Sequence, residues 1–206
     1  MKTLVTLIVS LLVVCSANAA QYAFKNIGPS SAFDALGIVD SAGAGLSTDA
    51  TVELGYFTNE AQASTGVFTS WTQFGNDVSF ATSGAFSTDG LFNGDVSGDI
   101  LSGSSFIGKS ITMFVTNDDG DEFLAAKTNF TFAEDNPLTT GDVFIYDTTS
   151  VTLTYLFGGA SYTGFALPSG LGARDAVKTL AVPEPSAYAL LGGLLALTCV
   201  MLRRRA

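Results

Sequence analysis

Carboxylates are the reactive side chains that cluster most closely in this sequence, and they are densest in the stretch TNDDGDEF at 116–123. The acidic residues of this stretch are Asp118, Asp119, Asp121 and Glu122. Calcium prefers such oxygens, but if Gly120 is the sixth residue of an EF-hand loop, the first and twelfth are Val115 and Ala126. The Asp119-Gly120 pair is more typical of a tight hairpin turn. The sequence therefore predicts a hairpin tip with solvated charges and no cofactor, with weak calcium binding as the alternative.

A second pair of carboxylates, Asp95 and Asp99, lies among glycines in FNGDVSGDI at 92–100. Two facing carboxylates can serve a glycoside hydrolase as general acid and nucleophile. Acidic residues are so frequent in this chain that such pairs are unavoidable, and Gly94 and Gly98 are typical of turns. We therefore expect a turn here, with carboxylate-dependent polysaccharide hydrolysis as the weaker alternative.

The single tryptophan, Trp71, lies between Phe68 and Phe74. Exposed aromatic rings at such a spacing could stack against the apolar faces of sugars. The same spacing fits Phe68 and Trp71 on one buried helical turn, and this core position is favoured over a carbohydrate-binding platform. The triplet Asn-Phe-Thr at 129–131 fits the glycosylation pattern but is interpreted as an ordinary strand end.

The elements that would carry these residues are predicted to be β-strands. Strand-forming residues alternate with polar ones in short runs separated by Gly-rich breaks, and the clearest runs lie at 51–57, 110–116, 142–147 and 151–157. In the last run the apolar face consists of Val151, Leu153, Tyr155 and Phe157. Phe114 lies opposite the other apolar residues of its run, which predicts that both faces of that strand are covered. Only short helices are expected, at 30–36 or 69–75, so the predicted fold is all-β, an antiparallel sandwich.

The chain contains no histidine, and its two cysteines, Cys15 and Cys199, lie near its ends. The absence of histidine excludes the Ser-His and Cys-His pairs of nucleophilic hydrolases and the usual zinc sites. Between residues 20 and 181 there are 18 acidic and 5 basic residues, a net charge of −13. Such a charge disfavours nucleic acid and anionic lipid as partners and is typical of a soluble extracellular protein.

The first 19 residues have the features of a secretory signal peptide. A basic residue precedes an apolar run at 4–14, which is too short to span a bilayer. Ala17 and Ala19 then supply the small residues that signal peptidase requires. Lipidation at Cys15 is disfavoured, because the residue before it is not small.

The C-terminal segment combines the motif Pro183-Glu184-Pro185, an uncharged stretch at 186–202 and the basic end Arg203, Arg204 and Arg205. The uncharged stretch has 17 residues. As a helix it would be about 25 Å long and could span a thin hydrocarbon core. The arginines would stay in the cytoplasm, so the preceding chain would lie outside. The two prolines keep the segment before the stretch extended, a form that a membrane-embedded processing enzyme could grip.

This C-terminal segment resembles the PEP-CTERM sorting signal, in which Pro-Glu-Pro, an apolar helix often containing glycines and a short Arg-rich end follow in order. Gly192 and Gly193 lie in the apolar stretch, and only Ala206 after the arginines departs from the pattern. The resemblance implies processing by an exosortase, a membrane protease-transpeptidase of Gram-negative bacteria that make extracellular polysaccharide. It implies that the tail is removed and the exported part is released or attached at the surface. The order of VELGYF, WTQFG, FIGKSITMFV and DEFLAAKTNFTF is similar to that in exported domains of some PEP-CTERM proteins.

The sequence therefore divides into a signal peptide at 1–19, a β-rich exported domain at 20–167, a linker at 168–182 and the sorting signal at 183–206. We expect export across the inner membrane of a Gram-negative-type bacterium, anchoring by a transmembrane helix at 186–202, and then a place at the cell surface or in the medium. Signal peptidase and exosortase are the expected partners, with exopolysaccharide as a further one. The predicted function is that of a non-enzymatic surface or matrix protein, and a carbohydrate-binding module is the main alternative.

Overall fold

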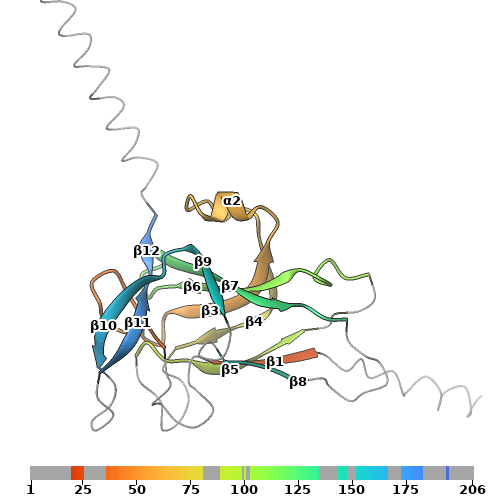
Figure 1. Ribbon diagram of the computed structural model, residues 1–206, viewed down its shortest axis with the longest axis horizontal. Coiled ribbons are helices and arrows are strands. Elements are labelled where there is room, and N and C mark those ends of the chain that lie inside the picture. The colour runs from red at the N-terminus through yellow and green to blue at the C-terminus, as the bar shows by residue number, and fades with distance from the viewer. Residues whose placement is uncertain are drawn as a thin grey trace, which may run out of the picture.

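The computed structural model describes residues 20–25, 36–80, 89–98, 100, 103–134, 143–147, 152–166, 173–182 and 194. This part of the chain forms three β-sheets and one short helix (Figure 1). The predicted all-β fold is therefore confirmed for the described residues. The strands expected from alternation are observed as Thr51–Phe57, Ser110–Thr116, Val143–Asp147 and Leu153–Phe157.

The largest sheet has six strands, in the order β12-β7-β6-β3-β4, with β9 also paired to β7. Its strands are β3 (Thr51–Phe57), β4 (Trp71–Ser79), β6 (Ser110–Thr116), β7 (Glu122–Thr131), β9 (Leu153–Phe157) and β12 (Leu180–Ala181). All of its strand pairs are antiparallel. The hairpin of β6 and β7 carries the acidic stretch at its tip, so Glu122 is the first residue of β7.

Two smaller sheets have three strands each, in the orders β5-β1-β8 and β10-β11-β2. Their strands are β1 (Ala20–Lys25), β2 (Gly37–Val39), β5 (Asn93–Gly98), β8 (Val143–Asp147), β10 (Ala160–Ala166) and β11 (Ala173–Lys178). The pairs β1–β8 and β2–β11 are parallel, in contrast to the antiparallel sandwich that the sequence predicts. Parallel partners lie far apart along the chain, so no hairpin signal could reveal them.

The main core lies between the six-stranded sheet and the two smaller sheets. Alternation along β3 and β6 directs Val52, Leu54 and Met113 into this core. From the other sheets, Val96 of β5 and Val177 of β11 pack into the same cluster. Figure 1 shows the β5-β1-β8 sheet below the six-stranded sheet.

The opposite face of the six-stranded sheet is covered by segment 58–70, which contains α2 (Glu60–Ala63). Asn59 caps this helix by accepting a hydrogen bond from the Gln62 backbone N–H at 3.3 Å. Beneath the segment lies what we call the outer aromatic cluster, made up of Phe57, Ala63, Phe68, Trp71, Phe114, Phe123, Ala125, Leu156, Phe157 and Val182. Phe114 is buried within it, which confirms the prediction that both faces of β6 are covered.

Three local predictions are wrong. Residues 69–75 do not form a helix, because β4 begins at Trp71 and pairs along β3. Gly94 and Gly98 are not turn residues but lie within β5, where Gly98 leaves room for the ring of Phe74.

The run at 151–157 does not present a single apolar face. A register shift in its pairing with β7 lets Leu153 pack on the main core while Phe157 joins the outer aromatic cluster. The possible helix at 30–36 lies outside the described residues, apart from Leu36.

The predicted linker at 168–182 is also wrong for its described part. Strand β11 pairs with both β10 and β2, and β12 pairs with the start of β7. The run ARDAVKTLA has few strong strand formers, and it is ordered by backbone pairing with distant strands. The β domain therefore extends to Val182, whose side chain packs against the outer aromatic cluster.

Candidate functional site

The acidic stretch forms the turn between β6 and β7, as the sequence predicts. The Gly120 N–H donates to the Asn117 carbonyl at 3.1 Å, and Gly120 has a φ of 74° in the left-handed region that favours glycine. The Asn117 side-chain oxygen accepts hydrogen bonds from the backbone N–H groups of Asp121 and Glu122, both at 3.0 Å. Asn117 therefore organises this turn, and its position before Asp-Asp-Gly is the signal that could have identified it.

The four carboxylates of this turn have different partners. Asp118 accepts from the Ser47 backbone N–H at 3.0 Å, and Asp121 accepts from the Asn117 side chain at 2.9 Å. Asp119 is exposed, whereas Glu122 is directed to other segments of the chain. Among the described residues, no group of three or more acidic or cysteine side chains is placed to hold a metal ion. A calcium site needs six to eight converging oxygens, and these carboxylates do not supply them together.

Glu122 connects three segments that are far apart in the sequence. One carboxylate oxygen accepts from the Ser41 backbone N–H at 2.7 Å and from the Thr179 hydroxyl at 2.5 Å, and the other accepts from the Ser41 hydroxyl. Lys178 donates to the Ser41 carbonyl at 2.7 Å and lies near the same carboxylate. Glu122 therefore fastens the loop after β2 and the junction of β11 and β12 to the β6–β7 hairpin.

The electrostatics of Glu122 fit a structural role. Burial raises its pKa, but hydrogen bonds from Ser41 and Thr179 and the charge of Lys178 outweigh burial and leave the pKa below its ordinary value of 4.5. A general base works best with a pKa near the operating pH, so a lowered pKa makes Glu122 a weak base. No local sequence pattern indicates this cluster, because Ser41 and Thr179 lie 81 and 57 residues away from Glu122.

The single tryptophan belongs to the outer aromatic cluster. Its ring centroid lies 4.8 Å from that of Phe57 and 5.1 Å from that of Phe114. The indole N–H of Trp71 donates to the Glu53 carboxylate at 2.6 Å. Phe74, by contrast, packs in the main core beside Phe106 and Phe132, and the three rings of the predicted sugar platform are therefore not brought together. The prediction that Trp71 is a core residue is supported, but through a strand and not through a helical turn.

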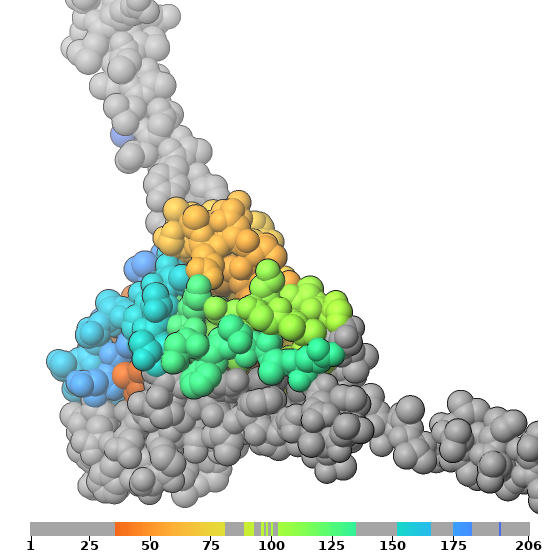
Figure 2. Space-filling view, turned by 45° about the vertical axis from the view of Figure 1, so that its right-hand side comes forward, coloured from red at the N-terminus to blue at the C-terminus, as the bar shows by residue number. Residues whose placement is uncertain are grey.

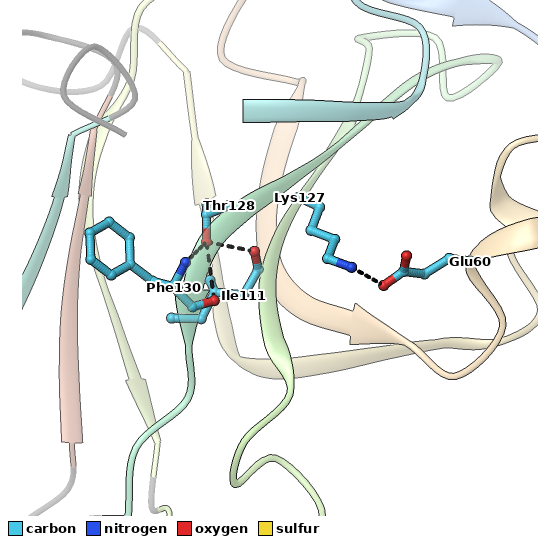
Figure 3. A network of polar contacts seen from close by, with 5 residues as sticks. All are labelled: Glu60, Ile111, Lys127, Thr128 and Phe130. Atoms are coloured by element: carbon cyan, nitrogen blue, oxygen red, sulfur yellow. Dashed lines mark hydrogen bonds and ion pairs between the residues drawn. The ribbon is translucent and has the colours of Figure 1, made fainter. Parts of the chain in front are cut away.

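Neighbouring residues of β7 connect to opposite faces of the sheet (Figure 3). Lys127 forms an ion pair with Glu60 of α2 at 2.7 Å, which fastens segment 58–70 over the outer aromatic cluster. Thr128 is buried, and its hydroxyl donates to the Ile111 carbonyl at 2.9 Å and accepts from the Phe130 N–H at 3.2 Å. Both contacts hold elements of the fold together.

Of the remaining candidate residues, some lie in strands and the others lie outside the described residues. Asp95 lies in β5 opposite Ala23 of β1, while Asp99 lies outside the described residues. Asn129 is exposed near the end of β7, as the strand-end interpretation predicts.

The predicted signal-peptidase residues Ala17 and Ala19 lie outside the described part of the chain. The same holds for the sorting residues Pro183, Glu184, Pro185, Arg203, Arg204 and Arg205. No helix within the described residues is long and apolar enough to cross a membrane. Of the stretch at 186–202, only Leu194 is described.

No protein-family model, curated protein or solved structure matches the chain. Within the described structure, the polar clusters at Glu122, Trp71 and Thr128 join separate segments of the fold.

Proposed function

We propose that this chain is an exported, non-enzymatic cell-surface or extracellular-matrix protein, with a β-sandwich body and a C-terminal sorting signal of the PEP-CTERM kind. The observation that carries the proposal is the order of three features, Pro183-Glu184-Pro185, an uncharged stretch of 17 residues and three arginines. In this proposal the stretch at 186–202 anchors the body outside the inner membrane of a Gram-negative-type bacterium. An exosortase then removes it.

The extent of the folded body supports this division of the chain. Strand β1 begins at Ala20, the residue after the proposed signal-peptidase site, so cleavage there leaves the strand intact. At the other end, β12 and the packing of Val182 occupy the chain up to the residue before Pro183. Both cleavages would thus remove segments that flank the folded body.

The character of the described polar clusters supports a non-enzymatic role. Glu122 accepts three hydrogen bonds within the fold, and Trp71 packs among phenylalanines with its N–H bonded to Glu53. A carbohydrate-binding module would need aromatic rings lined up on a surface, whereas Trp71 and Phe74 pack in different clusters. Secretion into a polysaccharide-rich envelope requires neither an active site nor such a platform.

The deciding experiment is intact-mass spectrometry of the exported protein from a host that contains an exosortase. We expect a mature form that lacks residues 1–19 and 186–206. A double variant, Pro183→Ala with Pro185→Ala, should retain the tail, whereas the control Pro168→Ala should be processed as the wild type. Recovery of the surface protein with residues 186–206 still attached would overturn the exosortase proposal and leave a permanent membrane anchor.

A further inference from the structure

The chain leaves the folded body beside segment 58–70. Strand β12 pairs with β7 through Leu180 and Ala181, and the Val182 side chain packs against the outer aromatic cluster. A Cβ placed on Gly66 would lie 3.2 Å from the Val182 methyl groups, so these two residues are neighbours. In Figure 1, α2 and β12 lie at the same end of the molecule.

Segment 58–70, at this end of the body, is itself short of charge. Segment 58–70 has one charged residue, Glu60, and its carboxylate is paired with Lys127 at 2.7 Å. Val67 and Leu180 expose 42% and 49% of their surface, so apolar area faces solvent here. We call segment 58–70 together with Leu180 the exit surface, and Figure 2 shows segment 58–70 (orange to yellow) forming the upper end of the coloured surface. It contrasts with a body whose net charge is −13 between residues 20 and 181.

The chain between the body and the proposed membrane segment is very short. Only Pro183, Glu184 and Pro185 separate Val182 from the uncharged stretch at 186–202. Three residues reach about 10 Å when fully extended. The headgroup layer on each side of a bilayer is about 5–8 Å thick, so this length is used almost entirely in crossing it.

We propose that, before the tail is removed, the exit surface lies against the headgroups of a zwitterionic lipid membrane. This inference rests on the proposed function, because it requires residues 186–202 to be in the bilayer. The exposed Val67 and Leu180 and the paired Glu60 suit an uncharged lipid surface. The acidic turn adjoins this surface, since Ala181 pairs with Glu122, and added anionic lipid is therefore expected to weaken the contact.

The test uses the chain from Ala20 to Ala206 in phosphatidylcholine vesicles, with Cys199→Ala as background. A fluorescent probe is attached at Val67→Cys, Leu180→Cys or, as the control, Thr163→Cys, each an exposed position. Thr163 of β10 pairs with Asp175 of β11, which lies five residues before Leu180, about 16 Å along an extended chain. Quenching by nitroxide-labelled headgroups is expected to be at least about twofold stronger at 67 and 180 than at 163, because such quenching requires near contact.

Two further measurements distinguish contact of the exit surface with the membrane from anchoring by the tail. Twelve Gly and Ser residues inserted between Val182 and Pro183 add a reach of about 20 Å and should equalise quenching at the three positions. Vesicle flotation reports separately whether the chain is anchored. A chain that floats but shows equal quenching without the spacer overturns the exit-surface proposal alone. A chain that does not float overturns the anchoring step of the proposed function and this inference with it.

Discussion

The indole N–H of Trp71 donates to the Glu53 carboxylate at 2.6 Å, and this bond joins the edge strand β4 to β3 across the outer face of the sheet. Gly55 lies between them, and the absence of a side chain there leaves room for the indole over β3. The bond satisfies the one donor of a half-buried ring and holds that ring over the outer aromatic cluster.

Removal of the Glu53 carboxylate should therefore destabilise the fold. In Glu53→Ala the half-buried indole N–H loses its partner, and the free energy of unfolding should fall by about 1–3 kcal/mol. Urea denaturation followed by Trp71 fluorescence measures this directly, because Trp71 is the only tryptophan. Glu60→Ala is the matched control: it also removes a hydrogen-bonded acid, but an exposed one, and should cost less than about 1 kcal/mol. Equal losses in the two variants would contradict the role given to Trp71.

The fold class could be predicted from the sequence because the signal is local. Alternation in SITMFVT indicates both the strand and the second covered face, since Phe114 falls opposite Ile111 and Met113. The pairing partners could not be predicted in this way. Strands β11 and β12 are ordered by contacts with β2, β10 and β7, and ARDAVKTLA carries only a weak propensity of its own.

For the candidate site, too, the sequence predicts the local turn but not the contacts between distant segments. Asp119-Gly120 indicates a turn, and the turn is present. The partners of Glu122 were not predictable, because Ser41 and Thr179 reach it only through the packing of the sheets. The helical spacing of Phe68 and Trp71 was misleading, because an i, i+3 spacing also fits a turn that leads into a strand: the Trp71 N–H donates to the Phe68 carbonyl at 3.0 Å.

The outer aromatic cluster should contribute to stability as a true core does. Phe114 is 7% exposed, and Phe114→Ala should lower the free energy of unfolding by about 3–5 kcal/mol. Phe130→Ala is the control, since Phe130 is 42% exposed on the neighbouring strand and its truncation should cost less than about 1 kcal/mol. Urea denaturation of the fragment at 20–182 gives both values. A loss at Phe114 no larger than at Phe130 would mean that segment 58–70 does not cover this face in solution.

The Glu122 cluster should make stability depend on pH in the acid range. Its pKa is lowered in the folded state, so its contribution is present above the ordinary value of 4.5 and is lost as the pH falls through the folded value. Glu122→Gln should cost on the order of 1 kcal/mol at pH 7, and the difference from wild type should shrink below pH 4.5. Asp119→Asn, on the exposed part of the same turn, serves as the control in thermal unfolding measured from pH 3 to pH 7. If the wild type is more stable than Glu122→Gln by the same amount at pH 3 and at pH 7, the charge of the carboxylate is not the source of the difference.

Calcium should not bind the acidic turn in a saturable manner. Asp118 and Asp121 are bonded to Ser47 and Asn117, and Glu122 is directed toward Ser41 and Thr179, so their oxygens do not converge. Isothermal titration of residues 20–182 with millimolar calcium should give only heat of dilution. A saturable signal that disappears in Asp119→Asn would show that the turn rearranges around the ion, contrary to this expectation.

Gly55 is so close to Trp71 and to the backbone of β4 that a side chain at this position should not fit. A Cβ on residue 55 would lie 2.2 Å from the Thr72 carbonyl oxygen and 2.8 Å from the indole ring, and the oxygen belongs to backbone that is paired in the sheet. Gly55→Ala should therefore displace β4 or the indole and cost at least about 2 kcal/mol, with a shift in Trp71 emission. Gly103→Ala is the control, because Gly103 has a φ of 85° but open space around it. Backbone strain alone should lower the free energy of unfolding of this variant by about 1 kcal/mol. If the two variants unfold at the same urea concentration and Trp71 emission is unchanged, the indole does not lie over β3.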